Sequence, residues 1–128
     1  MKKILVTGSA GFIGFHVSTR LLMNGYPIIG IDNLNDYYDI NLKKARLAHL
    51  AKNPHFQFIK MDIVERQQMS SLFEKEKPEY VFLAAAMVGG IMANNTFRAD
   101  FIYQNIMIQS NVINASWKYG VKKLLFLG

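Results

Sequence analysis

The sequence predicts an α/β domain in which five parallel strands alternate with helices. Three observations lead to this fold class: a glycine-rich turn after the first strand, an acidic residue that ends the second, and short apolar runs alternating with helical patterns. Right-handed crossovers then favour a doubly wound sheet with strand order 3-2-1-4-5. We expect residues 1–128 to form a single domain, since they contain no linker, repeat or low-complexity segment.

Composition excludes several classes of protein. With 51% hydrophobic and 19% charged residues, the 128-residue chain is typical of a globular domain and not of a disordered one. The chain has no cysteine, which excludes disulfides and thiolate metal sites. No signal peptide or long apolar run is present, so we expect a cytoplasmic protein that does not enter a membrane.

The net charge of +6 raises the question of nucleic-acid binding. The basic residues are scattered, however, and the densest group, Lys43, Lys44 and Arg46, lies on a predicted helix after an acidic loop. We interpret this group as a solvated helix face. Electrostatic attraction of an anionic cofactor is sufficient to explain the positive net charge, and we expect no nucleic-acid partner.

The first strand, Ile4–Thr7, leads into a glycine turn and then a helical pattern that stops at Asn24-Gly25. Gly8 would make the tight turn, Gly11 would leave room for the phosphates of a dinucleotide, and Gly14 would let the helix pack closely on the strand. The first helical turn supplies N–H donors and the positive end of the helix dipole. The alternative is an ordinary structural turn. The predicted phosphate-side residues are Gly8, Ala10, Gly11, Phe12, Ile13 and Gly14.

The second strand, Ile28–Ile31, ends in Asp32. A carboxylate there can accept both hydroxyls of the adenosine ribose and would repel a 2′-phosphate, which favours NAD over NADP. Asn33 opens a polar loop, residues 33–39, that we expect beside the adenosine end of the cofactor.

A helix is predicted over Leu42–Lys52 and a third strand over Phe56–Met61. His49 and His55 flank the end of that helix, and without a second ligand at metal spacing we interpret them as surface histidines. Asp62 follows the third strand and can face the adenine amino group, while Ile63 covers the ring. Alternatively, Asp62 caps the segment from Val64 onward.

The next helix is predicted over Glu65–Lys77, with Met69, Leu72 and Phe73 on its apolar side. Tyr80–Ala86 is a continuous apolar run, as expected for a central strand buried on both faces. The small residues at its carboxyl end, Ala84, Ala85 and Ala86, would let a nicotinamide ribose approach the backbone.

The longest helix is predicted over Phe97–Tyr119, and a fifth strand over Val121–Gly128 follows the helix stop at Gly120. We predict that one stripe of this helix faces the core and that its tryptophan has no ligand role. That stripe consists of Ile102, Ile106, Gln109, Ile113 and Trp117.

Two stretches resemble known enzymes. From Lys2 to about Ala85 the chain resembles bacterial UDP-glucuronate 4-epimerases, through T-G-S-A-G-F-I-G and the G-I-D-N-L-N-D-Y-Y-D-I-N-L-K stretch from Gly30 to Lys43. Residues 84–105 and the K-K-L-L-F-L-G stretch at 122–128 are similar to GDP-L-fucose synthases, although Met87 replaces an expected basic residue. Both groups are extended short-chain dehydrogenases with a Rossmann-like fold, which act on nucleotide sugars with NAD or NADP.

This two-part resemblance is typical of a chimera, a recombined gene, a designed Rossmann unit or the N-terminal part of an epimerase or reductase. In the family, a serine and a Tyr-x-x-x-Lys pair perform the chemistry. We can place none of these, and interpret the spacing of Tyr119 and Lys123 as accidental because Gly120 stops the helix between them.

The resemblance therefore implies an NAD-binding part without catalytic residues of its own. The alternatives are a fragment of an active enzyme and a structural unit with little ligand binding. A nucleotide sugar would be a partner only of a longer parent. We also expect a homodimer or larger oligomer, formed through the apolar edge strand Leu124–Leu127 and the long helix.

Overall fold

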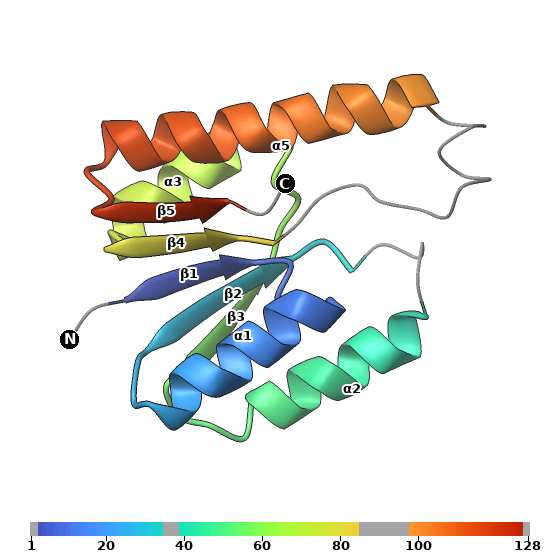
Figure 1. The fold of residues 1–128 in the computed structure, drawn as a ribbon, viewed down its shortest axis with the longest axis vertical. Helices are drawn as coiled ribbons and strands as arrows, with labels where there is room; N and C mark the ends of the chain where they lie inside the picture. Colours follow the sequence, from blue (N-terminus) through green and yellow to red (C-terminus); the bar gives the residue numbers. More distant parts are fainter. Residues whose placement is uncertain (1–2, 35–38, 85–97, 127–128) are drawn as a thin grey trace.

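Five parallel strands form one sheet in the order β3-β2-β1-β4-β5, which confirms the predicted order and the Rossmann-like class (Figure 1). The computed structural model describes residues 3–34, 39–84 and 98–126. The strands are β1 (Ile4–Thr7), β2 (Ile28–Asp32), β3 (Phe56–Lys60), β4 (Tyr80–Leu83) and β5 (Lys123–Phe126).

Helices cover both faces of the sheet (Figure 1). α1 (Phe12–Met23) and α2 (Ile40–Leu50) lie on one face, and α3 (Arg66–Glu76) and α5 (Arg98–Lys118) on the other. α2 begins at Ile40 rather than at the predicted Leu42, because the Asp39 side chain accepts a hydrogen bond from Asn41 N at 2.9 Å and caps the helix earlier. Among the described residues, no helix is both long and apolar enough to span a bilayer.

Three predicted strands are longer than the observed ones. The strand predicted over Phe56–Met61 ends at Lys60. The strand predicted to run from Tyr80 to Ala86 ends at Leu83, and Ala85 and Ala86 lie outside the described residues. The strand predicted from Val121 begins at Lys123, because Val121 N donates to the Ser116 carbonyl at 2.9 Å and thereby closes the end of α5.

The core has two layers, one on each face of the sheet. Leu5 of β1 joins the layer formed with α3 and α5, whereas Ile4 and Val6 join the layer formed with α1 and α2. β1 is therefore buried along its whole length, which explains why its sequence is a continuous apolar run. The prediction for α3 is confirmed, since Met69, Leu72 and Phe73 are all buried.

The predicted inner stripe of α5 is wrong. Ile106, Ile113 and Trp117 are 57%, 50% and 82% exposed, and the side chain of Ile102 lies outside the described residues. The buried face consists of Ile108, Asn111, Val112, Ala115 and Ser116. α5 carries two apolar stripes on opposite sides of the helix. Both stripes have the periodicity of a helix, so periodicity alone does not indicate which one is buried. Small residues such as Ala115 lie on the side that packs against the sheet.

Candidate functional site

The glycine turn lies at the carboxyl end of β1. Gly8 adopts φ +74°, and the N–H groups of Gly8 and Ser9 both donate to the Ile31 carbonyl, at 2.7 and 3.2 Å. The turn is therefore tied to the end of β2. α1 begins at Phe12 with Gly11 as its N-cap, and a glycine has no side chain to accept the N–H groups of the first turn. Free N–H donors together with the positive end of a helix dipole are what the binding of an anion requires.

The other two glycines, Gly11 and Gly14, differ in how closely the backbone of the turn approaches them. A Cβ built on Gly14 would lie 2.1 Å from the Gly8 carbonyl oxygen and 3.1 Å from Ser9 Cα, so only glycine lets α1 approach the turn this closely. A Cβ on Gly11 would lie 3.2 Å from the same oxygen, which a small shift relieves. The role of Gly14 is thus structural, whereas Gly11 lacks a comparable packing demand.

Asp32 connects the glycine turn with the loop after β2. Its side chain is 7% exposed; Oδ2 accepts from Ala10 N at 3.1 Å and Oδ1 accepts from Leu34 N at 2.8 Å. An ionised carboxylate has about four acceptor sites, so two backbone bonds leave capacity for ribose hydroxyls. Leu34 itself has φ +56°, a strained conformation for a leucine that occurs often in ligand-binding loops. Asn33, between them, is half-buried.

Two basic residues of α2 reach this site, which the sequence interpretation missed. Lys43 is buried, with Nζ 3.9 Å from Asp32 Oδ1, and Arg46 is half-buried and donates from Nη1 to the Ala10 carbonyl at 3.1 Å. The solvated-face interpretation is therefore wrong for these two and right only for Lys44, which is exposed. The only signal in the sequence was their spacing of three residues, which places both on one side of a helix.

Asp62 and Ile63 follow β3, at the same edge of the sheet as Asp32. Asp62 Oδ1 accepts from Val64 N at 3.1 Å and closes a turn. The alternative role as a helix cap is wrong, because α3 begins at Arg66 with Glu65 as its N-cap. The Ile63 side chain packs in the core, and its carbonyl accepts from Asn111 Nδ2 of α5 at 2.8 Å. Asn111 thereby fixes this loop, a role that the sequence did not indicate.

Ala84 is held at the carboxyl end of β4 by Thr7. The Thr7 hydroxyl accepts from Ala84 N at 3.1 Å and donates to the Phe82 carbonyl at 3.4 Å. Ala85 and Ala86, predicted to lie near a nicotinamide ribose, are outside the described residues. Four neighbouring strands thus bring the predicted site residues to one edge of the sheet, where the strands have their carboxyl ends. These residues are Asp62 after β3, Asp32 at the end of β2, the glycine turn after β1 and Ala84 after β4.

The remaining candidates do not form a site of their own. His49 and His55 are exposed, as predicted, and the described part of the chain contains no group of three or more His, Cys, Asp or Glu that could hold a metal ion. Tyr119 follows the end of α5 and Lys123 begins β5, so their four-residue spacing does not lie on one helix.

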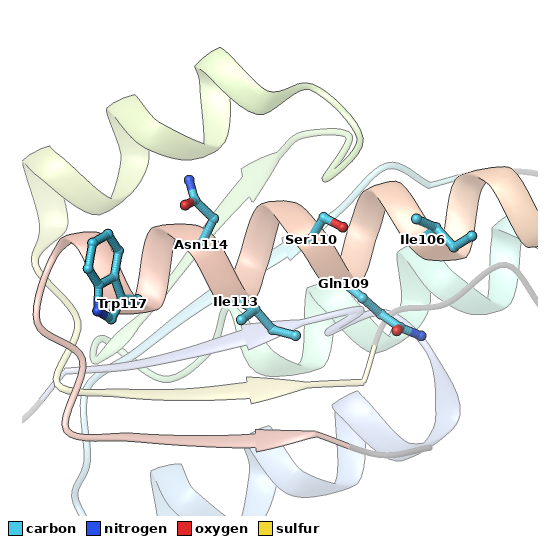
Figure 2. Close-up of a pocket in the computed structure, with 6 residues that line it drawn as sticks. All are labelled: Ile106, Gln109, Ser110, Ile113, Asn114 and Trp117. Atoms are coloured by element: carbon cyan, nitrogen blue, oxygen red, sulfur yellow. The ribbon is translucent and has the colours of Figure 1, made fainter.

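A groove of about 450 Å³ lies on the outer side of α5, on the face of the sheet opposite α1 (Figure 2). It is lined by Ile106, Gln109, Ser110, Ile113, Asn114 and Trp117. The helix rather than the strand ends forms this groove, so it is distinct from the edge that carries the glycine turn.

Residues 4–128 match the model of the NAD dependent epimerase/dehydratase family. The chain belongs to that family. GDP-L-fucose synthase 1 of Arabidopsis thaliana is 39% identical over 126 residues, which are 98% of this chain and 32% of that protein. UDP-glucuronate 4-epimerase of Thermodesulfobacterium geofontis is 39% identical over 94% of this chain and 37% of its own length. This chain therefore spans about a third of these epimerase/dehydratase relatives.

A solved structure of a UDP-glucuronic acid 4-epimerase has the same fold. UDP-glucuronic acid 4-epimerase from Bacillus cereus, in complex with UDP-glucuronic acid and NAD, superposes with a TM-score of 0.84 at 32% identity, over 95% of this chain and 38% of that one. Both groups of enzymes named by the two-part resemblance thus occur among the relatives of this epimerase/dehydratase chain.

Proposed function

We propose that this chain binds NAD, as the cofactor-binding part of a nucleotide-sugar epimerase or reductase. The observation that carries the proposal is the hydrogen bond from Ala10 N to Asp32 Oδ2 at 3.1 Å. It brings an anion site at the start of α1 and a ribose-binding carboxylate to one place, which is the arrangement that a dinucleotide requires. NAD supplies hydride transfer when it is bound.

Each part of the cofactor has candidate residues. The pyrophosphate would receive N–H donors from the turn and from the first turn of α1, the ribose would lie on Asp32 and Asn33, and the adenine beside Asp62 and Ile63. The nicotinamide ribose would lie against the end of β4. The pyrophosphate residues are Gly8, Ala10, Gly11, Phe12, Ile13 and Gly14, and those beyond β4 are Ala84, Ala85 and Ala86.

Asp32 supports NAD rather than NADP, because a buried carboxylate accepts from ribose hydroxyls and repels a 2′-phosphate. Calorimetric titration of the purified chain with each cofactor tests this. We expect tighter binding of NAD, whereas equal binding of the two would contradict the assignment.

We further propose that residues 1–128 form a single Rossmann domain that does not catalyse turnover alone. Tyr119 and Lys123 form the single Tyr-x-x-x-Lys spacing of the sequence; Tyr119 lies in the turn after α5, whereas Lys123 is the first residue of β5. Two alternatives remain testable: part of an active enzyme, which would regain turnover when the rest of a relative is supplied in trans, and a structural unit, which would bind no cofactor. The cytoplasmic location stays a prediction from the sequence.

A homo-oligomer is the remaining part of the proposal. Three large apolar side chains, Ile106, Ile113 and Trp117, are exposed on the outer side of α5. β5 is the last strand of the sheet in the described part of the chain, so one side of it pairs with no other described strand, and Leu125 is 54% exposed. Exposed apolar area beside an open strand edge favours pairing with a second copy.

A further inference from the structure

The sheet has a second edge at β3, on the opposite side from β5. β2 is the only described strand that pairs with β3. Met61, directly after β3, donates its N–H to the Asp32 carbonyl at 3.0 Å. The backbone groups of successive residues in a strand face opposite sides, so those of Phe58 and Lys60 face away from β2. An added strand would find these donors and acceptors at the edge.

A groove of about 340 Å³ lies between this edge and α3. Its apolar side chains are Ile59, Met61 and Leu72, and the last two are each 7% exposed. Polar side chains of α3, from Gln67 to Lys75, line its other side. The helix rises about 12 Å over that span, which is the length of about four residues of an extended chain. The groove therefore fits a short extended segment that places alternate side chains on its apolar floor.

Two lysines give this groove a positive charge. Lys60 and Lys75 are exposed, and none of the described residues that line the groove is acidic. Neither ammonium group forms an ion pair within the described part of the chain. Glu74 and Glu76 flank Lys75 in the sequence, but neither lines the groove, and Glu76 pairs with Lys3 at 3.1 Å. The groove is thus complementary to a segment that carries carboxylates.

The charge of the chain disfavours a second copy as the occupant. The net charge is +6, and a lysine on an edge strand opposes pairing with another basic strand. The same lysines attract an acidic strand. Its apolar side chains would cover Ile59, Met61 and Leu72 while its backbone pairs with β3.

We propose that the groove between β3 and α3 docks an extended acidic segment of a partner protein, which adds a strand to the sheet. The interaction goes beyond the proposed cofactor binding. It also uses the edge of the sheet opposite the one that we propose for the homo-oligomer.

The test uses a labelled octapeptide that alternates glutamate with valine, acetylated and amidated so that its ends carry no charge. Fluorescence anisotropy measures its binding to the purified chain at low ionic strength. Lys60→Glu and Lys75→Glu should each weaken binding about threefold to tenfold, and added salt should weaken binding to the unmodified chain. A peptide that alternates lysine with valine should not bind.

Lys52→Glu is the matched control, because it changes the net charge equally at an exposed lysine just beyond α2. It should alter binding by less than about twofold, since the charge lies outside the groove.

A second comparison separates backbone pairing from charge. Lys60→Gln and Lys60→Pro both remove the ammonium group, but only proline also removes the outward N–H, which an edge strand tolerates. Lys60→Pro should bind the glutamate–valine peptide about threefold to tenfold more weakly than Lys60→Gln. Circular dichroism checks that both variants are folded.

Equal binding by Lys60→Glu, Lys75→Glu and Lys52→Glu, or no binding to the unmodified chain, overturns the acidic partner. Equal binding by folded Lys60→Gln and Lys60→Pro overturns strand addition. A shift to monomer in Lys60→Pro alone, measured by sedimentation, would assign the β3 edge to a second copy instead. Tighter binding of oligodeoxythymidine than of the acidic peptide, lost in Lys60→Glu, would assign the groove to a nucleic acid and also overturn the proposal.

Discussion

Replacing Gly14 with alanine tests the packing of α1 against the glycine turn. The added Cβ would lie 2.1 Å from the Gly8 carbonyl oxygen and 2.7 Å from the Gly8 carbonyl carbon. Both atoms belong to the backbone, so no side chain can rotate away. Ordinary contact begins at 3.4 Å, and α1 would have to move from the turn by about 1.3 Å.

The cost follows from two opposing effects. Alanine favours a helix over glycine by up to about 1 kcal/mol. Overpacking of a rigid site costs about 1–3 kcal/mol, and the shift also pulls the buried Leu22 away from its core layer. We expect Gly14→Ala to lower the free energy of unfolding by about 2 kcal/mol, which corresponds to several degrees in melting temperature. Gly11→Ala should change stability by less than about 1 kcal/mol, because its Cβ needs only a small shift.

Urea unfolding followed by circular dichroism measures both variants, and titration with NAD follows for each. Gly11→Ala should stay folded and lose NAD affinity, since the added methyl group narrows the approach of the phosphates. Ser18→Ala is the matched control, because Ser18 is buried one turn further along α1 and its hydroxyl has no hydrogen-bond partner among the described residues. It should be neutral or stabilising. Equal stability of Gly14→Ala and the unmodified chain would refute the packing argument.

Three further predictions concern the core, the assembly and the chemistry. Asn111→Leu removes the buried donor to the Ile63 carbonyl and should cost about 1–3 kcal/mol in urea unfolding, whereas Asn114→Leu, at an exposed position, should cost far less; equal losses would count against the bond. Sedimentation over a dilution series should detect a homodimer or larger species, and Leu125→Lys should shift it toward monomer; a folded variant with an unchanged oligomer would exclude the β5 edge as the contact. The purified chain alone should neither epimerise UDP-glucuronate nor reduce a GDP-keto sugar, and turnover above a buffer blank would contradict the proposed absence of catalytic residues.

The strands and their order were predictable because the residues that delimit each strand are its neighbours in the sequence. Glycine and proline stops separate the apolar runs, and the handedness of the crossovers leaves few orders for five parallel strands. The meeting of Gly8–Gly14 with Asp32 was predictable for the same reason, since the carboxyl ends of adjacent parallel strands share one edge. The start of α2 was missed because Asp39 is one of several acidic and amide residues in its loop, each able to cap a helix.

The other errors concern tertiary contacts. Lys43 and Lys44 are equivalent in the sequence, and only the placement of α2 against the end of β2 buries one and exposes the other. Likewise α5 has two stripes with the same period, and the one with larger side chains, including Trp117, faces outward. The role of Asn111 depends on the Ile63 carbonyl, which lies far from it in the sequence, so the helical pattern around Asn111 does not indicate this hydrogen bond.

Calorimetric titration of the unmodified chain with NAD, ADP-ribose and nicotinamide mononucleotide tests the central proposal most directly. In the proposed site, the glycine turn, Asp32 and the loop after β3 would all contact the adenosine and pyrophosphate half of the cofactor. ADP-ribose should therefore bind almost as tightly as NAD, and nicotinamide mononucleotide should bind far more weakly. Equal binding of nicotinamide mononucleotide and NAD, or binding of none of the three, would contradict the proposed site.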